Sequence, residues 1–157
     1  MPEFHRADRG LARAREILER EAQHFSDIPD AILELTGGSS VAGALTGGDV
    51  DLHLRVPPDA FAATVELLQA RYDVVHPEIW CATLATFEVP GGERIGVAVT
   101  PIGSEHDVRF RGAWERLRVD PAALDAYNAM KRAHADADEA SYLAAKADFF
   151  EHLARNS

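Results

Sequence analysis

The 157-residue sequence predicts one α/β (α+β) domain, in which a small mixed β-sheet is flanked by helices and followed by C-terminal helices. Two observations support this fold class. Segments with helical spacing and segments with alternating apolar residues follow one another through residues 6–100, whereas residues 108–153 show only helical patterns. No linker, repeat or low-complexity stretch divides the chain, so residues 1–157 are expected to form a single domain.

The chain begins with a predicted helix over residues 6–25. Its apolar residues recur at helical spacing, namely Leu11, Ala14, Ile17, Leu18 and Ala22. A short strand over residues 31–36 follows, and Gly37 and Gly38 end it. Residues 41–45 are predicted to form one or two helical turns.

The next strand, predicted over residues 49–56, has two chemically different sides. Because side chains alternate along a strand, one side carries the apolar residues Val50, Leu52, Leu54 and Val56. The other side carries the polar residues Asp49, Asp51, His53 and Arg55. A helix that begins at Pro57 and Pro58 and runs through Leu68 is expected after this strand.

Two further strands are predicted over residues 82–89 and 93–100, and Pro90-Gly91-Gly92 suits the hairpin loop between them. Three helices complete the chain, around residues 108–117, 121–134 and 139–153. Asp120 suits the N-cap of the second of these helices, and Pro121 suits its first turn. This order favours a small mixed sheet with helices packed on one side.

Composition and charge exclude several classes of protein. The net charge of −10 argues against general nucleic-acid binding, which requires neutralisation of backbone phosphates. No apolar run approaches the roughly 20 residues that span a bilayer, and residues 1–6 lack an apolar signal region. A single cysteine, Cys81, excludes an internal disulfide framework, so a cytoplasmic location is the default expectation and Cys81 is expected to be a small buried side chain.

Asp49 and Asp51 are the first candidate site residues. Alternation directs both carboxylates to the same side of a strand, with backbones roughly 6 to 7 Å apart. Such acidic neighbours repel each other unless a cation lies between them, which favours Mg²⁺ or Mn²⁺ as a cofactor. The alternative is an edge strand whose charged side simply faces water. His53, on the same side, is a candidate ligand for metal or substrate, and its alternative is an exposed strand histidine.

The turn Gly37-Gly38-Ser39-Ser40 is the second candidate. Glycines after a strand allow a sharp turn whose amides can meet phosphate oxygens, and the two serines add hydroxyl donors. An ordinary turn with a serine cap is the alternative. A strand, a Gly-Gly-Ser turn and an Asp-x-Asp strand in succession are more specific to a nucleotide site than either half alone.

These residues resemble the nucleotidyltransferase superfamily with the polymerase-beta-like fold, and within it the GrpB family. The local resemblance is Gly38-Ser39-Ser40-Val41-Ala42-Gly43 leading to Asp51-Leu52. A second resemblance lies in the C-terminal half, in Leu117-Arg118-Val119-Asp120-Pro121, Tyr127 to Lys131-Arg132, and Tyr142 to Lys146 and Phe149. Together these segments span roughly residues 15 to 153.

The resemblance implies a nucleotidyltransferase-like fold with a C-terminal helical part against the sheet. Members of the family are poorly assigned in activity, and some relatives are fused to dephospho-coenzyme A kinase. Many relatives keep only the acid that corresponds to Asp51, so this chain is closer to the metal-binding pattern of the superfamily. Relatives often have His-x-His where Gly96 and Ala98 stand here.

The resemblance also suggests a third carboxylate, and the clustered basic residues of the predicted C-terminal helices supply the candidates for phosphate binding. Active nucleotidyltransferases usually add a third carboxylate, and alternation favours Glu88 over Glu93 for this catalytic role. Arg111, Arg118 and Lys131 are the candidates for phosphate or substrate binding, because a guanidinium suits bidentate contact and residues 111 and 118 share a helix face. The alternatives are an exposed glutamate at a strand end and arginines that pair with surface acids.

The leading hypothesis is therefore Mg²⁺-dependent transfer of a nucleotidyl group from a nucleoside triphosphate to an unknown acceptor. In this hypothesis Asp49 and Asp51 hold the metal and Gly38, Ser39 and Ser40 hold phosphates. One alternative is a non-catalytic nucleotide- or cofactor-binding module of the GrpB family. Another is an interaction domain whose acidic surface meets a basic partner protein.

Overall fold

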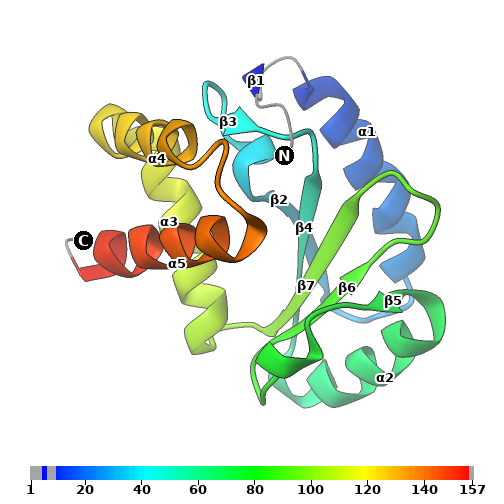
Figure 1. The fold of residues 1–157 in the computed structure, drawn as a ribbon. Coiled ribbons are helices and arrows are strands. Elements are labelled where there is room, and N and C mark those ends of the chain that lie inside the picture. Colours follow the sequence, from blue (N-terminus) through cyan, green and yellow to red (C-terminus); the bar gives the residue numbers. More distant parts are fainter. Residues whose placement is uncertain (1–4, 7–9, 156–157) are drawn as a thin grey trace.

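The structure is a computed structural model that describes residues 5–6 and 10–155. Its centre is a five-stranded mixed sheet in the order β2-β4-β7-β6-β5, with helices on both faces (Figure 1). The strands are β2 (Ile32–Thr36), β4 (Val50–Val56), β5 (Asp73–Val74), β6 (Ala85–Glu88) and β7 (Ile95–Pro101). β4 and β7 are parallel, and each other neighbouring pair in this sheet is antiparallel.

Helices α1 (Leu11–Ala22) and α2 (Phe61–Arg71) cover one face of the sheet (Figure 1). The apolar side of β4 is the centre of this core, because Leu52, Leu54 and Val56 are fully buried and Val50 is nearly so. The alternating pattern of β4 is thus confirmed on its apolar side. Burial of these side chains contributes about 1.5–3 kcal/mol each, which holds the strand in register.

Helix α3 (Glu105–Val119) lies against the opposite face, and α4 (Pro121–Ala133) and α5 (Glu139–Arg155) pack on α3 (Figure 1). A second apolar cluster joins these helices to the segment after β2; its buried members are Val41, Ala44, Trp114, Leu117, Ala123 and Tyr127. Asp120 caps α4 by accepting hydrogen bonds from the amides of residues 122 and 123, and Pro121 begins this helix, as predicted.

Several expectations about the elements need correction. Helices cover both faces of the sheet, not one, because β4 carries a second, polar layer that α3 buries. The segment 41–45 is not helical; a 3₁₀ turn occupies Gly38–Ser40, and β3 (Leu45–Thr46) pairs with β1 (His5–Arg6) instead. Gly43 has a φ of 86°, a left-handed conformation that cannot continue a helix.

The remaining differences concern strand ends. The hairpin strands are shorter than predicted, and the two-residue strand β5 was not expected. Cys81 is exposed, not buried, because it lies in a tight turn before β6, where its amide pairs with the carbonyl of Leu84. The predicted first helix begins at Leu11; part of the segment before it lies outside the described residues.

In the described part of the chain, no helix has the length and apolarity needed to cross a membrane.

Candidate functional site

Asp51 lies on β4 between two neighbouring strands that carry glycines close to it. Its backbone pairs with Thr36, the residue before the Gly37 turn, and with Gly96 on β7. A Cβ added to Gly37 would overlap the Asp51 carboxylate, and one added to Gly96 would lie 3.0 Å from Asp51 Oδ1. The carboxylate therefore packs directly against the backbone of two glycines, which only residues without a side chain permit.

The surroundings of Asp51 leave its charge uncompensated by hydrogen bonds. The residue is half-buried, and burial followed by the nearby charge of Asp49 raises the pKa of its carboxyl group, while Lys146 and Lys131 act in the opposite direction. Within the part of the chain that the structure describes, no hydrogen bond or salt bridge to this carboxylate is found. A half-buried acid of this kind is costly unless something else in the functional state compensates its charge.

Asp49 is exposed and lies just before β4, not within it. Its carboxylate forms a salt bridge with Arg94 at 2.8 Å, and its carbonyl accepts a hydrogen bond from Ser39 Oγ. It is near enough to Asp51 to raise the pKa of that residue. The interior position of β4 in the sheet also removes the alternative in which the acidic pair belongs to a solvated edge strand.

The serine turn is held by its own hydroxyls. Ser39 is buried and its Oγ lies 3.0 Å from Thr46 Oγ1, which ties the turn to β3. Ser40 Oγ donates to the Gly37 carbonyl at 2.7 Å and accepts from Arg118 Nη2 at 3.1 Å. The structure thus places the glycine-serine turn, Asp51 and one of the predicted arginines in one region.

Two lysines and two tyrosines from α4 and α5 complete this region. Lys131 Nζ donates to the Leu45 carbonyl at 2.8 Å, and a Cβ on Gly38 would lie 3.4 Å from Lys131 Nζ and 3.1 Å from the Tyr127 hydroxyl. Burial, with a smaller contribution from the charge of Lys146, lowers the pKa of Lys131 to about 8. Burial and then the charges of Asp49 and Asp51 raise the pKa of Tyr142.

Tyr127 is fully buried, and its hydroxyl has no hydrogen-bond partner among the described residues. Sequence reasoning favoured helix packing for this side chain, and its ring does pack edge-on against Trp114 at 5.8 Å between centroids. The ring edge that carries the hydroxyl nevertheless points to the Gly38 turn. The sequence signal for this arrangement was the repeated Tyr-x-x-x-Lys spacing, which puts each tyrosine and lysine one helical turn apart. Lys146 and Tyr142 were not among the predicted site residues.

Glu88 is not beside the acidic pair. It is exposed at the end of β6 and pairs with Gly96, which in turn pairs with Asp51. The backbones of Glu88 and Asp51 are therefore two strand spacings apart, about 10 Å. Among residues 5–6 and 10–155, no three His, Cys, Asp or Glu side chains are grouped closely enough to hold a metal ion.

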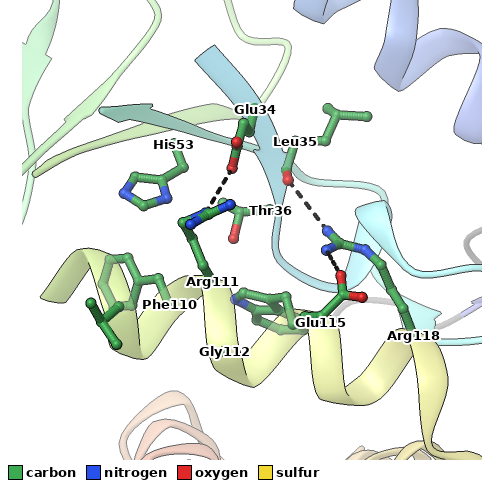
Figure 2. A pocket seen from close by; sticks show the side chains of 11 residues that line it. Glu34, Leu35, Thr36, His53, Phe110, Arg111, Gly112, Glu115 and Arg118 are labelled. Atoms are coloured by element: carbon green, nitrogen blue, oxygen red, sulfur yellow. Dashed lines mark hydrogen bonds and ion pairs between the residues drawn. The ribbon is translucent and has the colours of Figure 1, made fainter. Parts of the chain in front are cut away.

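A groove between β2 and α3 opens next to the acidic site, with a volume of about 520 Å³ (Figure 2). Both predicted helix arginines line it, and so does Thr36, the strand partner of Asp51. Arg111 faces Glu34 at 3.7 Å, and Arg118 contacts Glu115 at 3.4 Å and the Leu35 carbonyl at 3.5 Å, as Figure 2 shows. The groove and the glycine-serine turn are connected through the bond from Arg118 to Ser40.

Further along the same side of β4, the polar residues Arg55 and His53 are buried and hydrogen-bonded. Arg55 donates from Nε and Nη2 to the two carboxylate oxygens of Asp107, at 2.7 and 3.2 Å. His53 is buried beside this pair, with Nε2 2.7 Å from Thr100 Oγ1, and burial lowers its pKa to about 4. His53 is therefore neither an exposed strand histidine nor placed with Asp49 and Asp51 as a metal ligand.

Comparison with known proteins supports a specific family. The family model described as GrpB protein matches residues 7–156. A UPF0157 protein of Vibrio cholerae is 26% identical over 153 residues, which cover 96% of this chain and 81% of that protein. The crystal structure of the conserved protein GrpB from Enterococcus faecalis superposes with a TM-score of 0.63 at 16% identity, over 96% of this chain and 99% of that one.

Two larger structures share the fold alone. The MgGTP-bound Cid1 poly(U) polymerase superposes with a TM-score of 0.52, and GLD-2 in its complex with RNP-8 with a TM-score of 0.55, each at 16% identity. The matched regions cover 77% and 87% of this chain but only 41% and 57% of those chains. The match over residues 7–156, together with the fold, shows that the chain belongs to the GrpB family and has a nucleotidyltransferase-like fold.

Proposed function

We propose that this protein binds a nucleoside triphosphate together with Mg²⁺, at the site formed by Asp51, the Gly38–Ser40 turn and the lysines of α4 and α5. The Asp51 carboxylate carries the proposal. It is half-buried between Gly37 and Gly96, its pKa is raised by burial, and it has no hydrogen-bond donor among the described residues. A cation bound at this position would offset the cost of burying the charge.

The available donors fit a magnesium ion that is bound with a nucleotide. Mg²⁺ in such sites is held by one or two carboxylates, and substrate phosphates and waters complete its shell. Asp51 would supply one carboxylate, and Asp49 a second, since its salt bridge to Arg94 is exposed and contributes at most about 1 kcal/mol. The Mg²⁺ ion would neutralise part of the negative charge of the phosphates, and Mn²⁺ would do the same.

The basic residues support binding of phosphates. Lys131 and Lys146 both act on the charge of Asp51, and Arg118 donates to Ser40 in the turn. Their positive charges come from α3, α4 and α5, on the same face of the sheet as Asp51. An anionic ligand beside the turn would therefore meet the basic side chains of Lys131 and Lys146 and the guanidinium of Arg118.

Nucleotidyl transfer to an unknown acceptor is the second candidate. The register of the sheet favours it in one respect, because Glu88 lies in the same row as Asp51, with only Gly96 between them. Glu88 would act as the general base in that reaction if the acceptor occupied the intervening space. Because Glu88 on β6 and Asp51 on β4 lie two strand spacings apart, nucleotide binding without nucleotidyl transfer is favoured as the principal function.

Thermal unfolding with different ligands tests the proposal. ATP with Mg²⁺ is expected to raise the Tm, by the equivalent of about 2.7 kcal/mol at a concentration of 100 times Kd, whereas adenosine with Mg²⁺ is expected to have no effect. Asp51→Asn should lose the response, and Asp59→Asn, an exposed acid at the start of the α2 region, should keep it.

The outcomes separate the candidates. Pyrophosphate release is measured with a panel of acceptors. If pyrophosphate is released, and if Glu88→Gln loses this release but keeps the Mg-ATP response of the Tm, nucleotidyl transfer is favoured over binding alone. No response to any of the four common nucleoside triphosphates, with Mg²⁺ or Mn²⁺, would contradict both nucleotide hypotheses. An interaction domain with an acidic surface would then be the remaining function.

A further inference from the structure

The groove between β2 and α3 has the size and construction of a small-molecule site (Figure 2). Its volume of about 520 Å³ lies within the usual range for ligand pockets, roughly 300–1,000 Å³. One wall is β2, and the other is a stripe of α3 at helical spacing, with Val108, Arg111, Glu115 and Arg118 in successive turns.

The charges that line the groove are balanced and alternate in sign. Arg111 faces Glu34 at 3.7 Å, and Arg118 faces Glu115 at 3.4 Å. All four side chains are at least 36% exposed, so these contacts are long, hydrated and weak. A ligand group could replace a partner in either contact at little cost, although Glu34 also contacts the buried Arg55 at 3.4 Å and a ligand ammonium group would share its carboxylate with Arg55. Two positive and two negative groups are then available to bind a ligand.

The other lining residues add apolar surface without adding charge. The Phe110 ring and the Trp114 side chain come from α3, whereas Leu35 of β2 contributes its backbone carbonyl, because its side chain packs against the core on the other face of the sheet. His53 closes the inner end, where its ring stacks edge-on with Phe110 at 5.5 Å between centroids. Because burial keeps His53 neutral at physiological pH, the inner end is uncharged.

We infer that this groove binds a small zwitterion of the α-amino-acid class. Its carboxylate would lie between Arg111 and Arg118, its ammonium group would face Glu34 or Glu115, and its side chain would pack on Phe110 and Trp114. A polyanion such as a triphosphate fits this lining poorly, since two carboxylates would repel it. An uncharged molecule would leave both arginine-glutamate pairs unused.

The zwitterion would lie beside the proposed nucleotide site and share Arg118 with it, but neither Asp51 nor the lysines of α4 and α5. Thr36 lines the groove and pairs with Asp51, and Arg118 joins the groove to Ser40. Binding in the groove nevertheless requires neither Asp51 nor a metal. The two proposals can therefore fail independently.

Titration calorimetry with the common α-amino acids, in the absence of nucleotide and metal, tests the inference on the full chain. At least one amino acid is expected to bind with a Kd below about 1 mM. Its amide, which lacks the carboxylate, and its deaminated acid, which lacks the ammonium group, should each bind at least about tenfold more weakly.

Matched variants locate the site. Arg111→Gln and Glu115→Gln should each weaken binding about tenfold or more, whereas Arg109→Gln, an exposed arginine on the same helix outside the groove, should not. Asp51→Asn should bind the amino acid as the unchanged protein does. The inference is wrong if no amino acid binds, if Arg111→Gln leaves the affinity unchanged, or if the deaminated acid or pyrophosphate binds the groove equally well.

Discussion

The polar side of β4 has two halves that differ in how their charges are satisfied. At the inner half, Arg55 is paired with Asp107 through two hydrogen bonds, and His53 is buried next to the pair under α3. At the outer half, Asp51 is surrounded by glycine backbone and has lysines at longer range. Both halves come from one alternating sequence pattern, so the pattern alone does not distinguish a structural polar residue from a functional one.

The difference lies in what the rest of the chain brings to each half. Helix α3 begins beside the inner half and supplies Asp107, which also accepts a hydrogen bond from the Gly103 amide at 2.8 Å. Although burial opposes it, hydrogen bonds from Arg55 and Gly103 lower the pKa of Asp107. Beside the outer half, the turn after β2 contributes Gly37 and β7 contributes Gly96, and neither has a side chain that could pair with Asp51. A fully paired polar cluster suggests a structural role, and an unpaired carboxylate suggests a ligand site.

The largest expected loss of stability comes from removing the Arg55–Asp107 pair in the inner half. Asp107→Ala removes two hydrogen bonds from the buried Arg55 guanidinium and leaves it the longer contact with Glu34 at 3.4 Å, so the expected cost is up to about 3–5 kcal/mol. Urea unfolding measures the loss. Asp49→Ala removes an exposed salt bridge with Arg94 and should cost less than about 1 kcal/mol. Similar losses for the two variants would show that the inner pair is not the structural half.

Acid should destabilise the protein through His53. Its pKa is about 4 in the folded state and 6.5 in the unfolded chain, so between these values the unfolded chain binds a proton that the folded protein does not. The free energy of unfolding therefore falls as the pH drops from about 6.5 to about 4, by up to roughly 3 kcal/mol. When the free energy of unfolding is measured with urea across this pH range, His53→Gln should show a weaker dependence on pH than the unchanged protein.

A smaller loss of stability is expected when a methyl group is added next to Asp51, in the outer half. Gly37 has φ 72° and ψ −177°, a conformation that side chains disfavour by about 1–3 kcal/mol, and its new methyl group would meet the Asp51 carboxylate. Gly37→Ala should therefore lower the Tm and abolish the Mg-ATP response together. Gly91→Ala is the matched control, because it also has a positive φ, 122°, but no described atom lies within 4 Å of its added Cβ. If Gly91→Ala also loses the Mg-ATP response, the loss in Gly37→Ala cannot be attributed to the contact with Asp51.

Much of the fold followed from local patterns. The alternation of β4, the helices α1 to α5 and the N-cap at Asp120 were predictable because each depends on spacing or on neighbouring residues. The segment 41–45 was predicted wrongly, because burial of Val41 and Ala44 against α3 and α4 and the left-handed Gly43 override its weak helical tendency. The exposure of Cys81 depends likewise on the turn before β6, which apolar composition does not reveal.

The candidate site was predictable only in part. The glycine-serine turn and the acid on β4 are close in sequence, and the structure brings them together through the pairing of Thr36 with Asp51. Gly96 stands where relatives often have a histidine, but its contact with Asp51 depends on the parallel pairing of β4 with β7. Lys146 lies 95 positions after Asp51 in the chain, and no local pattern relates the two.

The order of residues by itself determined the secondary structure and the amphipathic character of β4, since both arise from interactions between residues only a few positions apart. Tertiary structure alone decided which charges on that strand would be neutralised. A partner for a buried charge must come through space, and in this molecule it comes from helices that follow in the chain: Asp107 of α3 reaches Arg55, whereas the basic partners of Asp51 among the described residues are the more distant lysines of α4 and α5.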